Sequence, residues 1–453
     1  MKRYEDFING IKEDVEVPAR VQARIDATLS ELPVVEETGR RKEKRSWMST
    51  AAAAILIIIA LSGCAAAGVH FSKTRVHVVV TGSQNTGNML QAEVEDFEKK
   101  YEEEHPDIDI VVERLLDDTT DWVEADIKKM RTDIMAGNGP DLYIMKGTLL
   151  ATNEHSYLFP NVNKAMQSGV FASLDKYMKK DERWKTTNYM QKALEAGTYK
   201  GKQYVIPLEI QFPIFVQEKA KAVDYSQAKD LKECAEIAKN SNDTEVQDNF
   251  LGLQFEMQGM LLEPALDYEN NQILMNKETF LDYAIFAQNA FYDTPFLEQA
   301  THSGLTRMYA SAMASVPEKE LDFQSVPGID GKHTGFVTAY GAVGMNSTKK
   351  EVAYDFLASF MDKESVVYCE NAPVNRERLQ KLLKEKGIQE EAFLRCYDNI
   401  DEIVFLSEGS LLAEEKLDQL LQRNAPPPES DFAGKAGKMY DEIYRTCETI
   451  LKE

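Results

Sequence analysis

Cysteine is the first residue type that the sequence has little of. Five cysteines occur in 453 residues, and no two of them stand at a C-x-x-C spacing. The sequence therefore gives no sign of a disulfide framework or a zinc site. One cysteine lies in an apolar stretch and four are scattered beyond it, so we expect buried free thiols, with one oxidised pair as the alternative. The five are Cys64, Cys234, Cys369, Cys396 and Cys447.

Catalytic motifs are also missing. The sequence contains no G-x-G-x-x-G, no G-x-S-x-G and no phosphate-binding loop. Its six histidines nowhere take the spacing of metal ligands on one helix. Carboxylates are so numerous that a catalytic pair would be hidden among them. We predict a protein that is not an enzyme and holds no metal or cofactor.

Positive charge is scarce as well, with 52 basic residues against 75 acidic ones and a formal net charge of −23. Lys and Arg together number 10 in residues 1–50, and so do Asp and Glu, so the acidic excess lies entirely after residue 50. Because phosphate contacts need clustered positive charge, this excess argues against nucleic acid as a partner.

One stretch is free of charge altogether: no charged side chain occurs between Arg45 and Lys73. As a helix it would be roughly 40 Å long, more than the ~30 Å of a bilayer core. Five basic residues within 40–45 precede it, and such clusters stay on the cytoplasmic side. We therefore expect a transmembrane helix over 47–71, a cytoplasmic segment over 1–46 and an extracytoplasmic domain over 72–453.

The same stretch allows an alternative anchor. Leu61-Ser62-Gly63-Cys64 resembles the lipobox of bacterial lipoproteins, in which the cysteine is acylated and becomes the new N-terminus. Either anchor tethers the main domain to a membrane face. Within 1–46, apolar residues recur every fourth position over 17–32, which favours an amphipathic helix that docks a cytoplasmic partner, or a poorly ordered tail as the alternative.

Apolar periodicity beyond residue 72 alternates between strand and helix patterns. It predicts strands over 75–80, 108–113 and 142–145, with helices over 90–101 and 123–134 between them. Parallel strands joined by right-handed helical crossovers form a doubly wound sheet, so this region is expected to be an α/β lobe.

Ligands of doubly wound sheets bind beyond the carboxyl ends of the strands. After the first predicted strand come Thr81, Gly82 and Ser83, and after the third come Lys146 and Gly147. These residues are candidate ligand contacts, and Tyr143, inside the third strand, is a weaker one. Turn residues are polar in any case, so a purely structural role is the alternative.

Two further segments are expected to cross between lobes. Gly201-Lys202 predicts a hairpin whose second strand ends at Pro207, and Glu209 and Gln211 follow it, either at a cleft or at a solvated strand end. The second crossover covers 336–338, with Tyr340 at its end. Thr348, three residues before an acidic residue, indicates a capping box that begins a helix.

Five segments, taken in order along the chain, resemble those of family 1 extracellular solute-binding proteins, the sugar-type receptors of ABC importers. Any one is weak, but the ordered set is specific and spans roughly 74–450. Physically, Gly137 caps a helix and Asp141 is expected to satisfy the backbone donors of the turn before it. The five segments are 135–141 (MAGNGPD), 174–177, 199–207, 338–347 and 371–375.

The resemblance implies a two-lobed, periplasmic-binding-protein-like fold of type II, with a hinge cleft. Lobe 1 is expected to cover about 72–208 and 340–375, and lobe 2 about 209–339 and 376–453. The implied function is capture of a small solute, expected to be a carbohydrate, for the membrane subunits of an ABC importer. The alternative is a transmembrane sensor that reports lobe closure to residues 1–46.

Tryptophan, which receptors of this type often stack on sugars, is rare here. After residue 72 only Trp122 and Trp184 occur, and neither lies at a predicted strand end. Tyr340, beside a glycine, is therefore the aromatic candidate for stacking on a sugar ring, with a core tyrosine as the alternative. Peptide or polyol ligands, or none at all, stay open.

Overall fold

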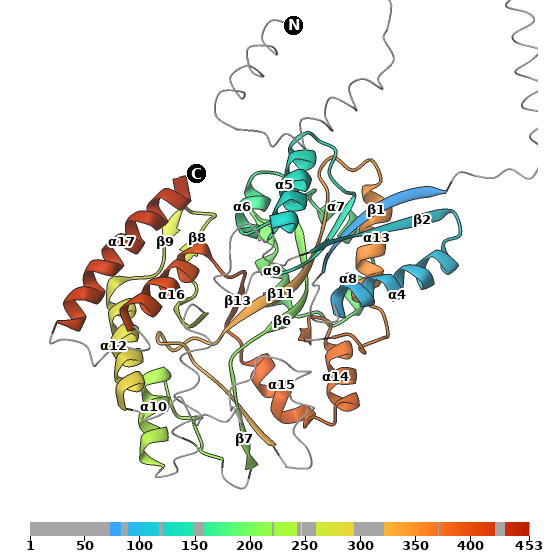
Figure 1. Cartoon of the computed structure of the whole chain (residues 1–453). Coiled ribbons are helices and arrows are strands. Elements are labelled where there is room, and N and C mark those ends of the chain that lie inside the picture. Colours follow the sequence, from blue (N-terminus) through green and yellow to red (C-terminus); the bar gives the residue numbers. More distant parts are fainter. Residues whose placement is uncertain are drawn as a thin grey trace, which may run out of the picture. The chain divides into compact units, whose positions relative to one another are not determined.

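The structure is a computed structural model. It describes residues 73–82, 89–116, 121–147, 157–219, 222–241, 246, 260–293, 321–369, 371–421 and 431–452. Residues 72–453 form one compact unit (Figure 1). The predicted cytoplasmic segment 1–46, the apolar stretch 47–71 with Cys64, and Ser83 lie outside the described residues. Of the helices that are described, none has the length and apolar character needed to cross a bilayer.

The predicted β-α-β-α-β order is present at the start of this unit. Strand β1 pairs in parallel with β2 on one side and with β3 on the other. Apolar stripes bury the two intervening helices against these strands, as their periodicity predicted. The elements are β1 (Thr74–Gly82), α4 (Met89–Glu104), β2 (Ile108–Leu116), α5 (Asp121–Met135) and β3 (Leu142–Lys146).

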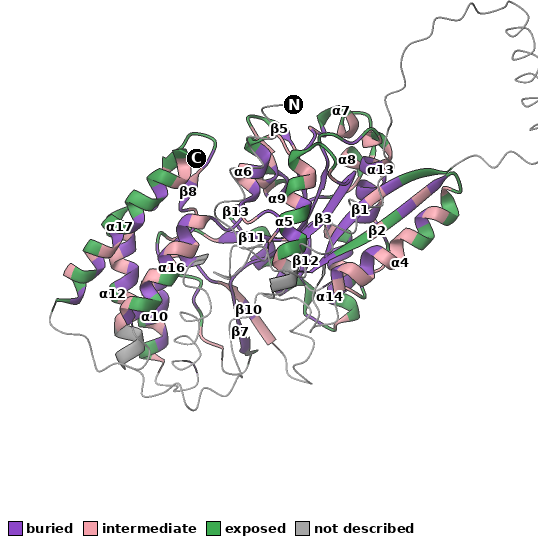
Figure 2. Ribbon diagram, turned by 45° about the horizontal axis from the view of Figure 1, so that its top comes forward, coloured by how far each residue is buried: buried purple, intermediate pink, exposed green. Residues whose placement is uncertain are grey.

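A long strand, β11 (Thr334–Val343), joins this parallel group to the rest of the sheet. Its second half pairs antiparallel with β3, and its other edge pairs antiparallel with β6 (Val205–Gln211). The sheet order is β12-β6-β11-β3-β1-β2, and β13 (Glu402–Val404) also pairs with the first half of β11. Every residue of β6 and β11 is buried, as expected for strands covered on both faces (Figure 2).

Two of the segments that carry the family resemblance meet at Asp141. Its carboxylate accepts hydrogen bonds from the His77 backbone N–H at 2.9 Å, the Ser347 hydroxyl at 2.7 Å and the Lys349 Nζ at 3.1 Å. These contacts join β1 to the turn after β11, whereas the sequence suggested the donors of the local turn. Gly137 has φ +82°, so the predicted left-handed helix cap is confirmed.

Short elements fill the larger core beside the sheet. The predicted hairpin at Gly201 is confirmed by the pairing of β4 (Thr198–Tyr199) with β5 (Lys202–Gln203). The remaining elements of this core are α6 (Val162–Gln167), α7 (Asp175–Met178), α8 (Arg183–Thr186), α9 (Gln191–Ala196), β7 (Ile214–Glu218), β10 (Leu321–Ser325), α13 (Lys350–Met361), β12 (Ala372–Pro373), α14 (Arg376–Glu385) and α15 (Glu390–Asp398).

A second hydrophobic core is mainly helical and has its own set of elements. Phe336 of β11 belongs to this smaller core, although the strand's later residues belong to the larger one. The long apolar stripe of the C-terminal helix is buried here. The elements are α10 (Leu231–Asn240), η3 (Met260–Leu262), β8 (Leu266–Asp267), β9 (Gln272–Ile273), α12 (Lys277–Asp293), α16 (Glu408–Leu421) and α17 (Phe432–Lys452).

Three local predictions are wrong. Pro207 lies inside β6 rather than at its end, opposite Tyr340, where the register with β11 shifts between Ala339 and Tyr340; proline is tolerated within a sheet at such irregularities. Tyr340 likewise lies inside β11 and not at its end. Thr348 is not a helix cap, since α13 begins after Lys349 and has no side-chain cap.

The four cysteines of the described residues are all buried and free, as expected.

Candidate functional site

The ends of strands β1 and β3, where ligand contacts were predicted, are held together by Thr81. Its buried hydroxyl accepts a hydrogen bond from the Lys146 backbone N–H at 3.1 Å and donates to the Met145 Sδ at 3.5 Å. Gly82 is the last residue of β1. Thr81 and Lys146 are therefore brought together as predicted, although the Thr81 hydroxyl is already used in joining the strands.

Gly147 connects this edge to the long strand β11. Its backbone N–H donates to the Thr338 carbonyl at 2.8 Å. A Cβ atom at Gly147 would lie 2.1 Å from the Val337 carbonyl oxygen, so no larger residue fits without moving the backbone. The end of β3 is thus held against the middle of β11.

Tyr143 and Tyr340 are both enclosed. Tyr143 is 1% exposed, and its ring packs edge-to-face against Phe159 at 5.2 Å and Phe171 at 5.7 Å. Tyr340 is also 1% exposed and packs edge-to-face on Phe405 at 5.4 Å. Burial raises the pKa of both phenols. Neither ring presents a face to solvent in this structure, and their roles as ligand contacts stay predictions.

Glu209 lies within a buried group of charged residues in the larger core. Its Oε2 accepts a hydrogen bond from the Asn371 backbone N–H at 3.2 Å. Nearby, the Glu93 Oε1 lies 3.0 Å from both the Lys363 Nζ and the Arg378 guanidinium. We call Glu93, Glu209, Lys363 and Arg378 the charge cluster.

Burial has the largest effect on the pKa values of Glu209 and Lys363. It raises the pKa of Glu209 to about 7, and the neighbouring Glu93 carboxylate adds to the rise while Arg378 and Lys363 oppose it. Burial also lowers the pKa of Lys363 to about 8, helped by Arg378 and opposed by Glu93. The opposite charges hold one another in place, so the cluster fits a structural role.

Gln211, two residues further along β6, has very different surroundings. It is fully buried, and neither its Oε1 nor its Nε2 has a hydrogen-bond partner among the described residues. Gln211 lies opposite Phe336 on β11, and directly opposed residues point to the same face of a sheet. Phe336 belongs to the smaller core, so Gln211 lies on the face that meets that core.

Thr338 lies two residues beyond Phe336 on β11 and, like Gln211, is a buried polar side chain. It is 3% exposed, and its Oγ1 has no partner among the described residues. The pairing register between β11 and β6 shifts on both sides of Ala339. Such irregularities re-aim side chains and are common beside functional sites.

A second pair of buried polar groups meets between the cores, and the sequence did not single it out. Asn161 caps α6 of the larger core through its Oδ1, while its Nδ2 makes no well-aligned hydrogen bond with a described residue. Tyr268 follows β8 of the smaller core, and the same is true of its buried hydroxyl. The Asn161 side chain and the Glu408 backbone lie close enough to this hydroxyl to act on it as hydrogen-bonding groups and lower its pKa, against the larger rise that burial causes.

Beside Tyr268, the buried carboxylate of Glu263 accepts hydrogen bonds from the Ala265 and Ser407 backbone N–H groups, both at 2.6 Å. The Ser410 hydroxyl also donates to it. Burial raises the pKa of Glu263, although these hydrogen bonds oppose the rise. This carboxylate connects the η3–β8 segment to the start of α16 and borders the region around Tyr268.

We call Asn161, Gln211, Tyr268 and Thr338 the junction group. Buried polar atoms almost always have partners, so the Gln211 amide and the Thr338 hydroxyl, which have none among the described residues, need an explanation. Sequence patterns predicted Gln211 but not the others. Asn161 follows Pro160 and reads as a cap, and Tyr268 sits in a short turn-rich segment, so no local signal marks either residue.

Trp184 is half-buried and packs against the larger core. The Trp184 indole N–H donates to the Tyr354 hydroxyl at 2.6 Å, and its ring packs on Tyr189. Trp122 lies in α5, and its side chain is outside the described residues.

Comparisons with solved structures give the same fold. An ABC substrate-binding protein from Listeria monocytogenes in complex with cycloalternan is 16% identical, with a TM-score of 0.53 over 83% of this chain and 99% of that one. A family 1 extracellular solute-binding protein from Alicyclobacillus acidocaldarius is 12% identical, with a TM-score of 0.55 over 84% and 99%. A periplasmic oligogalacturonide-binding protein from Yersinia enterocolitica is 14% identical, with a TM-score of 0.52 over 84% and 99%.

Comparison with curated proteins finds no match. The family model for bacterial extracellular solute-binding proteins, however, matches residues 84–366, more than half of the chain. That family consists of binding proteins and not of enzymes, so the predicted absence of catalysis agrees with it. The resemblance noted in the sequence and the two-lobed α/β solute-binding fold are confirmed, and the chain belongs to the bacterial extracellular solute-binding protein family.

Proposed function

We propose that this protein captures a carbohydrate at the junction group and delivers it to the membrane subunits of an ABC importer. The observation that carries the proposal is the buried Gln211 amide and Thr338 hydroxyl, which have no partner among the described residues, beside the contact between Asn161 and Tyr268. Leaving a buried polar atom unpaired costs about 1–3 kcal/mol, so a ligand that pairs these atoms is favoured. Two of the solved structures above are named for oligosaccharide ligands.

The chemistry of the junction group suits hydroxyl-rich ligands. Each amide offers two donors and an acceptor, and each hydroxyl can both donate and accept. Sugar hydroxyls have the same dual character. Because Asn161 and Gln211 come from the larger core and Tyr268 from the smaller one, a ligand that bonds to all three stabilises the closed arrangement more than an open one.

The predicted strand-end contacts complete the proposed site. Thr81, Gly82 and Lys146 lie at the ends of β1 and β3, and Gly147 joins that edge to Thr338. Ser83 is proposed as their neighbour along the chain. We propose the two hydrophobic cores as the two lobes, with α14 and α15 assigned to the larger one because their apolar faces are buried in it.

We further propose that residues 47–71 anchor the protein, either as a retained helix with 1–46 in the cytoplasm or through lipidation of Cys64. The main domain would then face outward, as expected of an extracellular solute-binding family. Mass analysis of the mature protein separates the two anchors, because acylation of Cys64 removes everything before it. The sensor alternative depends on residues 1–71, and neither the comparisons nor the described residues support it.

The test is calorimetric titration of the full chain in detergent with gluco-, manno- and galacturono-oligosaccharides. We expect one class to bind, and Gln211→Leu to weaken that binding by about tenfold or more. Gln203→Leu is the matched control, because Gln203 is also buried but its amide donates to the Leu194 and Val205 carbonyls. Binding of a peptide or polyol set alone, or none, would overturn the carbohydrate proposal.

A further inference from the structure

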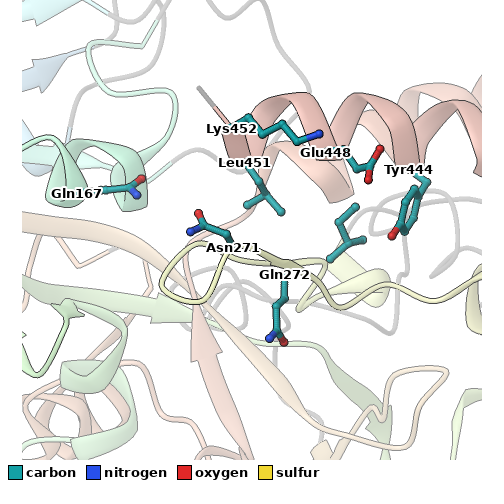
Figure 3. A pocket seen from close by; sticks show the side chains of 8 residues that line it. Gln167, Asn271, Gln272, Tyr444, Glu448, Leu451 and Lys452 are labelled. Atoms are coloured by element: carbon teal, nitrogen blue, oxygen red, sulfur yellow. The ribbon is translucent and has the colours of Figure 1, made fainter.

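A pocket of about 830 Å³ lies beside α6, on the same elements that carry part of the junction group. Figure 3 shows Gln167 of α6 on one side of it and the β8–β9 hairpin and α17 on the other. Its lining residues are Gln167, Asn271, Gln272, Ile273, Tyr444, Glu448, Leu451 and Lys452. We propose that this pocket is an extension of the solute site, which binds the further units of a long oligosaccharide; this inference rests on the proposed function.

The position of the pocket supports continuity with the junction group. Asn161 caps the first turn of α6 and Gln167 is its last residue, so the two are about 9 Å apart along the helix. On the opposite side, Tyr268 begins the turn of the β8–β9 hairpin, and Asn271 and Gln272 end it. Helix α6 and the β8–β9 hairpin therefore border both the junction group and the pocket, so a single extended ligand can contact both sites.

The lining chemistry suits a chain of sugar units. Gln167, Asn271 and Gln272 supply amide donors and acceptors, which match hydroxyl groups. Tyr444 is 40% exposed and offers an aromatic ring with a polar tip. Among the described lining residues, Glu448 and Lys452 are the charged ones, one of each sign, so the described lining has no net charge and suits an uncharged ligand.

The hairpin is held in a fixed shape before any ligand binds. The Asp267 carboxylate accepts hydrogen bonds from the Glu269 N–H at 2.9 Å, the Asn270 N–H at 3.0 Å and the Asn270 Nδ2 at 2.7 Å. Asn271 takes a left-handed φ of +54°, which asparagine tolerates better than most residues. A fixed wall loses little freedom on binding and so favours affinity.

A hydrogen bond to the larger core also holds the β8–β9 hairpin in place. The Lys200 backbone N–H, at the turn of the β4–β5 hairpin, donates to the Glu269 Oε2 at 3.1 Å. The two hairpins therefore meet at their turns, and α6 packs near β4 on the same side. The walls of the pocket come from both cores, and this hydrogen bond joins the two cores beside it.

The experiment measures how affinity depends on ligand length. The full chain in detergent is titrated with gluco-, manno- and galacturono-oligosaccharides of two to six units. We expect the six-unit ligand of the preferred class to bind about tenfold tighter than the two-unit ligand. Tyr444→Ala and Gln272→Ala should each reduce this ratio about fivefold, the value of one lost contact, and leave the affinity for the two-unit ligand unchanged.

Arg445→Ala is the matched control, since Arg445 is exposed on the same helix but does not line the pocket. It should leave the ratio unchanged. If the wild type binds ligands of all lengths with equal affinity, the pocket is not an extension of the solute site. The same conclusion follows if the two variants weaken short and long ligands alike. Either result leaves the proposed solute site itself intact. Failure of every saccharide to bind overturns the proposed function and this inference with it. Melting temperatures of all variants confirm that they are folded.

Discussion

Two buried polar regions of this protein differ in how their atoms are paired. In the charge cluster, Glu93 lies 3.0 Å from both Lys363 and Arg378, and Glu209 accepts from Asn371, while the Arg378 Nε and the Asn371 Oδ1 have no partner among the described residues. In the junction group, neither the Gln211 amide nor the Thr338 hydroxyl has any partner among those residues. Removing one partner of a buried ion pair is strongly destabilising, whereas an unpaired neutral group costs free energy unless a ligand pairs it. We therefore assign a structural role to the charge cluster and propose a ligand-binding role for the junction group.

The largest effect on stability is expected from removing Glu93, the carboxylate that contacts both Lys363 and Arg378. Glu93→Ala leaves two buried cations without their partner, which should lower the free energy of unfolding by about 3–5 kcal/mol. Urea denaturation measures the change. Glu103→Ala, on the exposed face of the same helix, is the control and should change it by less than about 0.5 kcal/mol. A loss below about 1 kcal/mol in Glu93→Ala would mean that the cluster does not stabilise the fold.

The sharpest comparison uses two buried glutamines. Gln211→Leu removes unpaired atoms, so we expect unchanged or higher stability together with at least about tenfold weaker binding of the preferred saccharide. Gln203→Leu breaks two hydrogen bonds to backbone carbonyls, so we expect about 1–3 kcal/mol of lost stability and unchanged affinity. If both variants lose stability equally and neither loses affinity, the distinction between the two regions is wrong.

The charge cluster also predicts a pH dependence. Because burial raises the pKa of Glu209 from 4.5 to about 7, its contribution to stability is fully present below about pH 4.5 and is lost as the pH rises through 7. Glu209→Gln abolishes this loss. The free energy of unfolding of the variant, relative to the wild type, should therefore rise by about 1–2 kcal/mol between pH 5 and pH 8. A flat difference across that range would show that Glu209 titrates normally.

The smallest expected changes in stability come from substituting two buried threonines, Thr81 and Thr338. Thr81→Val removes a hydroxyl that accepts from Lys146, and should cost about 1 kcal/mol. Thr338→Val removes an unpaired hydroxyl, and should cost nothing or stabilise slightly. Thermal unfolding of the two variants measures both changes. Equal destabilisation would indicate that the Thr338 hydroxyl is already paired in the protein.

Local patterns predicted the parts of this fold that local physics determines. The alternation of β-branched strands with amphipathic helices over 75–145 gave β1, α4, β2, α5 and β3 in their observed order. The left-handed cap at Gly137 and the turn at Gly201 followed from glycine chemistry alone. Each of these features depends on residues close together in the chain.

Features that depend on distant partners were missed. Glu209 looked like a strand-end contact, yet α4 and α14 bring Glu93 and Arg378 beside it from far along the sequence. Pro207 looked like a strand end, because the register with β11 that accommodates it cannot be seen locally. Asn161 and Tyr268 are separated by more than a hundred residues, so their meeting is a property of the tertiary structure.

Strand β11 pairs along one edge with two different strands. Its residues Thr334–Phe336 are bonded to β13 and its residues Ala339–Val343 to β3. Only Val337 and Thr338 lie between the two ladders, at the point where the register with β6 also shifts. The ladder with β6, on the other edge, runs past this point. These two residues therefore join the start of β11, which reaches the smaller core through Phe336, to the part that lies in the larger core, beside the atoms that we expect a solute to touch.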